Sequence, residues 1–196
     1  MQKNPYQLRM RNNFLDSFRL IEKNAILFNG QQVIFADLFS CRLCLMQWRS
    51  VGFCVNFECV FSHSKASLSN VMNSLGTPDG LHYICEKIGY SVPIGGELIG
   101  RKFTGRIIPQ AIDKKERARI LTRVLRLKGC EWGKNLGFDV LGRCCDTYKR
   151  CVYIHGTNLE KFIPAPLSCG CLLLNSEHLI ALFDQVFVGA LCFLLK

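Results

Sequence analysis

The residues best suited to chemistry in this 196-residue chain lie between Tyr153 and Asn175. His155 is followed by Gly156, and Cys171 comes 16 positions after the histidine (171 − 155). A cysteine attacks as its thiolate, and an adjacent imidazole can accept the thiol proton. The Gly156 carbonyl is placed to hold the far ring nitrogen and fix the tautomer. The spacing indicates thiol-based acyl transfer. It also fits a structural interpretation, with one of twelve cysteines buried and a hydrogen-bonded histidine at a strand end.

The residues just before Cys171 suit a tight turn. Ser168 and Cys169 lead into Gly170, which can adopt backbone angles that other residues avoid. Inward-pointing N–H groups in such a turn are what stabilisation of an oxyanion requires. The sequence therefore predicts the nucleophile and its oxyanion donors in one short loop.

The elements that must position these residues are mostly strands. Residues 25–63 and 81–132 carry short β-prone runs separated by turn signals, and residues 151–154 form a further run ending at His155. Residues 175–188 predict a helix with Ser176 as its N-cap, followed by a final strand. We expect a mainly β fold, either a β-sandwich or a partly closed barrel of short antiparallel strands, with one or two helices.

The chain is predicted to consist of an N-terminal arm and one domain. Residues 1–24 read as a polar N-terminal arm with one short helical piece, and residues 25–196 as a single domain. The apolar run 179–195 is interrupted by polar residues and is shorter than the roughly 20 residues of a membrane-spanning helix, so no transmembrane segment is expected.

The net charge and the cysteines of the chain indicate which binding partners and which cellular compartment to expect. The formal net charge is +10, but no aromatic ladder accompanies the basic run 114–128, which favours a solvated basic face and no nucleic acid partner. No secretory signal is visible in residues 1–23, which predicts a reducing, cytoplasmic compartment if the chain starts at Met1. The Cys-x-x-Cys pair at 41–44 lies in a strand-like run, so no metal site is expected. The oligomeric state is not indicated.

The segment between Tyr153 and Asn175 also resembles the sequence signature of a known protein family. The run HGT at 155–157, followed by PLSCGC at 166–171, resembles the signature of the L,D-transpeptidase catalytic domain. Residues 73–80 resemble the strand-to-loop element that precedes the site in that family, and the likeness covers about residues 25 to 195. Members join peptidoglycan stem peptides through a cysteine acyl-enzyme.

The resemblance implies roles for named residues. Cys171 would be the nucleophile and His155 the base, with the Gly156 carbonyl orienting the imidazole. The residues implied in the oxyanion hole and in substrate binding are Gly170, Ser168, Cys169 and Thr157. The thiol would attack the bond before the terminal D-alanine of a stem tetrapeptide. D-alanine would leave, and an amine of a neighbouring stem would form the cross-link. No cofactor is implied, the partners are peptidoglycan stem peptides, and the location is the periplasm or cell envelope.

The chain departs from the family pattern at two positions. Cys169 stands where the family has histidine, and Leu173 stands where arginine or asparagine is common. Neither side chain can replace the hydrogen bonds of an imidazole or guanidinium. Two alternatives follow: a catalytically impaired relative that binds peptidoglycan or a partner protein, and a cysteine hydrolase that releases D-alanine to water.

Overall fold

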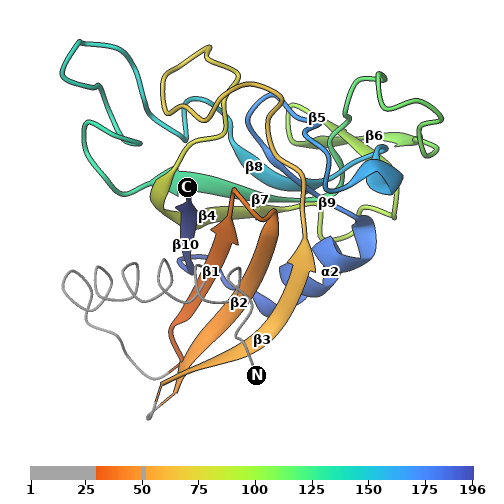
Figure 1. Ribbon diagram of the computed structural model, residues 1–196. Coiled ribbons are helices and arrows are strands. Elements are labelled where there is room, and N and C mark those ends of the chain that lie inside the picture. The colour runs from red at the N-terminus through yellow and green to blue at the C-terminus, as the bar shows by residue number, and fades with distance from the viewer. Residues whose placement is uncertain (1–29, 50–51) are drawn as a thin grey trace, which may run out of the picture.

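Within residues 30–49 and 52–196, which the computed structural model describes, ten strands form the framework (Figure 1). The strands are β1 (Gln32–Asp37), β2 (Arg42–Arg49), β3 (Gly52–Val60), β4 (Gly80–Ile88), β5 (Gly96–Ile99), β6 (Lys102–Ile107), β7 (Leu121–Gly129), β8 (Tyr153–Gly156), β9 (Leu172–Leu174) and β10 (Leu191–Leu195). A 3₁₀ turn, η1 (Glu160–Phe162), and the helix α2 (Ser176–Gln185) complete the regular structure of this part of the chain. The mainly β class is confirmed.

The strands form one mixed sheet in the order β3-β2-β1-β10-β4-β7-β5-β6, with β8 joined to β7 and β9 joined to β8. Most neighbours are antiparallel, but β1 pairs in parallel with β10, and β8 in parallel with β9. The sheet is therefore not wholly antiparallel, and it is not closed into a barrel. The crossover 157–171 joins β8 to β9, and β1 and β10 lie far apart in sequence, so neither pair is joined by the tight hairpin that would make it antiparallel.

The main core lies between the sheet and α2. The helix buries Leu179, Leu182 and Phe183 against residues of the central strands, including Leu125 and Ile154. In Figure 1, α2 lies beside the sheet near β7 and β9. No helix of the described residues is long and apolar enough to cross a membrane.

The start of α2 differs from the prediction that Ser176 is the N-cap. Asn175 is the N-cap, and its side chain accepts the His178 N–H at 2.8 Å. Ser176 is already helical, and its hydroxyl donates to Glu160 Oε1 at 2.6 Å. Asparagine and serine are about equally good N-cap residues. Glu160, which lies between β8 and β9, binds the Ser176 hydroxyl, and this leaves Asn175 as the N-cap.

Two predictions about the N-terminal part of the chain fall on residues that the structure does not describe. They are the polar arm at residues 1–24 and the strand expected before Gly30. Gly30 itself turns the chain into β1 with φ +94°, a left-handed conformation that favours glycine. β2 pairs with β3 in antiparallel fashion, from Arg42 opposite Val60 to Arg49 opposite Gly52.

Ile154→Ala is expected to destabilise the domain by about 2–5 kcal/mol, because it removes a fully buried side chain from the core beneath α2. Urea unfolding of both proteins measures the difference. Ile112→Ala is the matched control, because Ile112 is 89% exposed. Equal stability of Ile154→Ala and the unaltered protein would contradict this packing.

Candidate functional site

The parallel pair β8 and β9 brings His155 and Cys171 together. His155 is in register with Leu173, and Cys171 immediately precedes β9, beside Tyr153. Alternate residues of a strand point to the same side of the sheet. Cys171 and Leu173 therefore face the side that His155 faces, and all three line one cavity.

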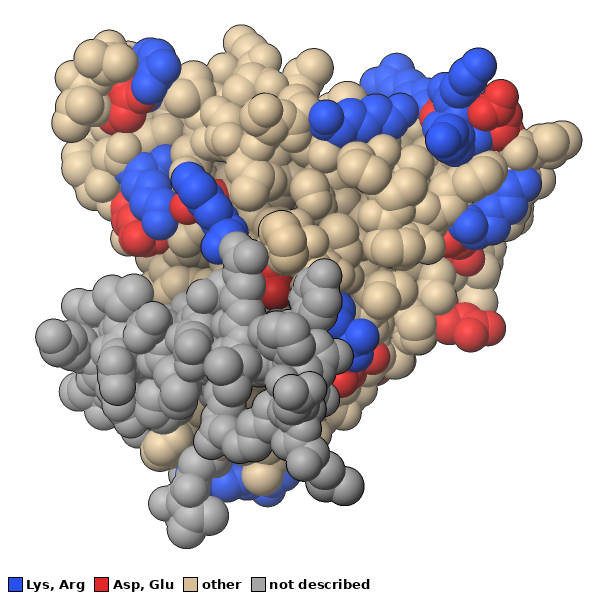
Figure 2. Space-filling model, in the orientation of Figure 1, with Lys and Arg blue, Asp and Glu red and all other residues tan. Residues whose placement is uncertain are grey.

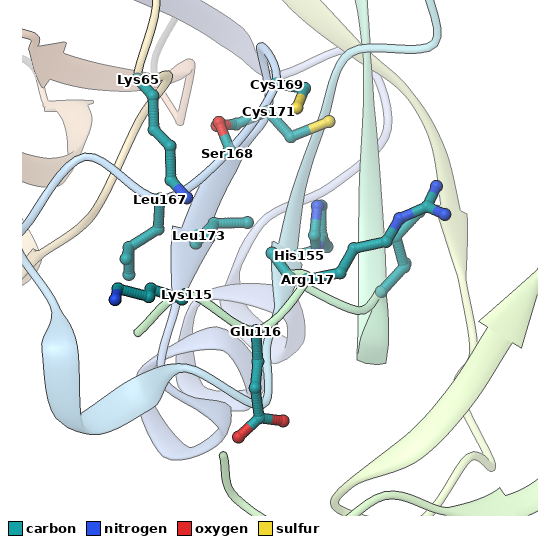
Figure 3. Close-up of a pocket in the computed structure, with 12 residues that line it drawn as sticks. Lys65, Lys115, Glu116, Arg117, His155, Leu167, Ser168, Cys169, Cys171 and Leu173 are labelled. Carbon is teal, nitrogen blue, oxygen red and sulfur yellow. The ribbon is translucent and has the colours of Figure 1, made fainter. Parts of the chain in front are cut away.

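That cavity has a volume of about 310 Å³, at the lower end of the range of small-molecule pockets (Figure 3). Its lining combines apolar, sulfur-bearing and cationic side chains: Lys65, Lys115, Glu116, Arg117, Ala118, Ile120, His155, Leu167, Ser168, Cys169, Cys171 and Leu173. In Figure 3 the Cys171 sulfur and the His155 ring lie between the two lysines on one side and Arg117 on the other.

The tautomer of His155 follows from its contact with the backbone. Its Nδ1 atom lies 2.8 Å from the Gly156 carbonyl oxygen. A carbonyl oxygen only accepts, so Nδ1 carries the proton and Nε2 keeps its lone pair. Burial lowers the pKa of His155 to about 4, and the bond to Gly156 offsets only part of that effect. His155 is therefore a neutral base at neutral pH.

Cys171 is a neutral thiol in the same pH range. Burial raises its pKa to about 11, although the Tyr153 N–H group, which donates to Cys171 Sγ at 3.4 Å, acts in the opposite direction. The thiol itself contacts the Cys151 carbonyl oxygen at 3.7 Å. The resting site thus holds a neutral thiol and a neutral imidazole, and a thiolate forms only when the proton moves.

The turn before Cys171 is closed by Ser168. Its hydroxyl donates to the Cys171 carbonyl oxygen at 2.6 Å and accepts the Gly170 N–H at 3.1 Å. Gly170 has φ +125°, and a Cβ there would lie 3.2 Å from the Gly76 carbonyl oxygen. Glycine at 170 thus satisfies both the turn conformation and the close approach of loop 64–79.

Arg150 holds that loop beside the thiol. Its guanidinium donates to the carbonyl oxygens of Ser69 at 2.9 Å and Gly76 at 2.6 Å. A second cavity of about 120 Å³ opens between the loop and the turn, lined by Arg150, Cys151, Cys169 and Cys171 among others. Cys171 therefore borders two cavities, one on the His155 side and one on the Arg150 side.

The structure brings most of the predicted site residues to the larger cavity. His155, Ser168, Cys169 and Cys171 line it. Gly156 does not line the cavity, but its carbonyl oxygen accepts a hydrogen bond from His155 Nδ1. Thr157 is fully buried, and its hydroxyl accepts the Leu159 N–H at 3.2 Å, so it shapes the start of the crossover.

Sequence reasoning missed several residues of the site, among them Lys65, Arg150 and Asn158, and it assigned Lys115 and Arg117 to a solvated basic face. Asn158 is buried and fixes the cavity rim, because its Oδ1 accepts the Arg119 N–H at 2.8 Å and its Nδ2 donates to the Arg117 carbonyl oxygen at 3.4 Å. The only feature of the sequence that could have indicated Asn158 is its position three residues after His155. Among the described residues, no group of three or more His, Cys, Asp and Glu side chains could hold a metal ion.

Comparisons with known proteins find a likeness in structure. No protein-family model matches the sequence, and no curated protein matches it significantly. The helical cell shape determining protein Pgp2 of Campylobacter jejuni matches with a TM-score of 0.56 and 12% identity, over 91% of this chain and 54% of that one. Bd1075 of Bdellovibrio bacteriovorus matches with a TM-score of 0.50 and 12% identity, over 85% and 48% of the two chains.

A fainter likeness, with a TM-score of 0.44 and 17% identity, covers 85% of this chain and 62% of L,D-transpeptidase 1 of Mycobacterium tuberculosis. The chain spans about half the length of the Pgp2 and Bd1075 structures. At these identities the likeness establishes the fold alone. In fold, the described residues form an L,D-transpeptidase-like domain.

Proposed function

We propose that this chain is a cysteine acyltransferase of the L,D-transpeptidase type, acting on peptidoglycan stem tetrapeptides in the cell envelope. One observation carries the proposal: a thiol and a neutral imidazole open on one cavity from neighbouring parallel strands, and the far nitrogen of the imidazole is held by the Gly156 carbonyl oxygen. This is the arrangement that an activated cysteine nucleophile needs.

In the proposed reaction, His155 Nε2 takes the proton of Cys171 as the sulfur attacks the carbonyl carbon before the terminal D-alanine. The new C–S bond forms first and gives a tetrahedral oxyanion. The C–N bond then breaks as His155 returns the proton to the departing amine. The products of this half-reaction are free D-alanine and a thioester on Cys171. The amine of a second stem peptide then attacks the thioester, forming an amide and regenerating the thiol.

The oxyanion of this reaction needs an N–H donor that is not already engaged. The Gly170 N–H is donated to Ser168 Oγ at 3.1 Å. The Cys171 N–H has no hydrogen-bond partner within the described part of the chain. We therefore assign the oxyanion to the Cys171 N–H, with the Gly170 N–H available once Ser168 releases it.

The size of the second cavity favours an additional outcome. A thioester on Cys171 must be reached by its acceptor, and the cavity on the Arg150 side measures about 120 Å³. That is well below the roughly 300 Å³ at which ligand pockets begin, so water reaches the thioester from this side more readily than a second stem peptide does. Hydrolysis of the thioester, which releases D-alanine and a tripeptide stem, is the second candidate function.

Incubation with disaccharide tetrapeptide, followed by mass spectrometry of the products, tests the proposal and separates the two outcomes. A cross-linked dimer with released D-alanine indicates transfer, and a tripeptide product indicates hydrolysis. An acyl adduct on Cys171 is expected in both. Absence of D-alanine release and of any adduct would contradict both functions and leave a binding role.

The protonation state of the pair predicts a pH dependence. Because the Cys171 pKa is raised to about 11, the thiolate fraction grows with pH throughout the neutral range. The rate of Cys171 alkylation by iodoacetamide, followed by peptide mapping, should rise about tenfold per pH unit from pH 7 to 9, with no plateau. A plateau below pH 8 would show instead a thiolate stabilised in the resting protein.

A further inference from the structure

The rim of the larger cavity carries three cations, Lys65, Lys115 and Arg117. All three are exposed, and none forms an ion pair within residues 30–49 and 52–196. Six other basic residues of the described chain do form ion pairs with carboxylates. Arg106 and Arg119, for example, both pair with the buried Glu97. Figure 2 shows Lys and Arg side chains gathered over the end of the molecule that carries β5 and β6 in Figure 1.

The one acidic residue of the cavity lining does not cancel this charge. The Glu116 carboxylate accepts the N–H groups of Ile112 at 2.8 Å and Asp113 at 3.3 Å, within its own turn. In Figure 3 it points away from the other labelled side chains. The cavity is therefore left with a surplus of positive charge.

The two lysines extend from backbone that the site itself holds in place. The Lys65 N–H donates to the Ser168 carbonyl oxygen at 3.1 Å, which ties Lys65 to the turn before the thiol. The Lys115 N–H donates to Asp113 Oδ1 at 2.9 Å, which fixes the facing turn. In Figure 3 the two ammonium ends lie on the same side of the cavity, across from Arg117.

Between the lysines and the thiol the walls are apolar. Leu167 and Leu173 are buried and line the cavity. Apolar walls exclude water and strengthen the attraction between an entering anion and the lysines. Leu173 also occupies the position at which the resembled family commonly has arginine, so β9 itself supplies no charge here.

We propose that Lys65 and Lys115 bind a carboxylate of the peptide that is attacked by Cys171, and thereby select acidic peptides. The inference rests on the proposed function for the identity of the peptide, but the anion site itself can be tested without turnover. A pair of ammonium groups accepts a carboxylate from varied directions, because each is a point charge on a flexible stem.

The test compares two alkylating probes of similar size at Cys171. Iodoacetate is an anion and iodoacetamide is neutral, and peptide mapping reads the rate at this thiol alone. In Lys65→Gln/Lys115→Gln, the iodoacetate-to-iodoacetamide rate ratio should fall about threefold to tenfold at low salt, and by less at 1 M salt, where the Debye length is about 3 Å. The iodoacetamide rate itself should not change.

Lys102→Gln/Lys196→Gln is the matched control, because it also removes two positive charges, from exposed positions outside the cavity. Its rate ratio should equal that of the unaltered protein. An unchanged ratio in the Lys65→Gln/Lys115→Gln variant, or an equal fall in the Lys102→Gln/Lys196→Gln control, would overturn the proposal.

A second arm uses substrate. For a tetrapeptide donor with free carboxylates, the Lys65→Gln/Lys115→Gln variant should raise KM about tenfold and leave kcat unchanged, and a donor with amidated carboxylates should lose this difference. A KM that is insensitive to both changes would also overturn the proposal. Absence of all turnover alongside a changed probe ratio would overturn the proposed acyl transfer and leave the anion site standing.

Discussion

Cys171→Ala is expected to lower D-alanine release to the background rate, a loss of about 10⁴-fold or more, because it removes the thiol that carries the acyl intermediate. The measurement is product formation from disaccharide tetrapeptide under single-turnover and multiple-turnover conditions. The adduct seen by intact-mass spectrometry should disappear with it. The fold should survive, because the Cys171 side chain lies at the edge of the core between β8 and the cavity.

Cys169→Ala is the informative control for this variant. Cys169 lines the same two cavities but is exposed, and it stands before Gly170 rather than beside His155. Turnover that persists in Cys169→Ala and vanishes in Cys171→Ala identifies the nucleophile among twelve cysteines. The opposite pattern, or retained turnover in both variants, would remove Cys171 from the mechanism.

His155→Ala is expected to reduce kcat/KM by about 10²–10⁴-fold, because the neutral imidazole is the group that accepts the thiol proton. The thiol pKa is raised to about 11, so without a base little thiolate exists at neutral pH. The deficit should shrink as pH rises toward that value, since hydroxide then ionises the thiol directly. The pH profile of kcat/KM between pH 6 and 10 measures this recovery.

A purely structural role for His155 would give a different profile. His155 is buried and bonded to Gly156, so its removal also disturbs packing. His155→Gln offers a side-chain N–H to the Gly156 carbonyl oxygen but no base, so it should fold normally and show the same loss. His178→Ala is the control histidine, because its ring lies against Phe57, outside the cavity. A pH-independent loss, or full activity in His155→Gln, would contradict the proposed base.

Much of the site was predictable because its chemistry is local in sequence. One short segment, residues 153–175, contains the histidine, the glycine that follows it, the serine turn and the cysteine. Their spacing can therefore be recognised in the sequence without knowledge of distant contacts. The structure places both side chains on the same cavity and puts the Gly156 carbonyl at the far ring nitrogen. Their chemical roles remain predictions.

What escaped prediction depends on contacts across the chain. Lys65 reaches the cavity through a backbone bond to Ser168, more than a hundred residues away in sequence, and no periodicity signals such a contact. Arg150 stands in a polar turn that reads as surface, yet three of its hydrogen bonds go to residues 69–76. Strand runs likewise do not reveal whether a neighbour is parallel, which depends on how the chain returns.

The parallel pairing of β8 and β9 has a consequence for how the chain can vary. Ladder hydrogen bonds, rather than the length of the crossover, hold Cys171 beside Tyr153 and near His155. The middle of that crossover, residues 161–166, contains no buried residue. Insertions at its exposed positions, such as Pro164 and Pro166, are therefore expected to disturb the thiol less than a shift in strand register does. One deleted residue inside β9, in contrast, would turn the following side chains to the opposite face of the sheet. The number of residues between histidine and cysteine is thus free to drift, while the register of the two strands is not.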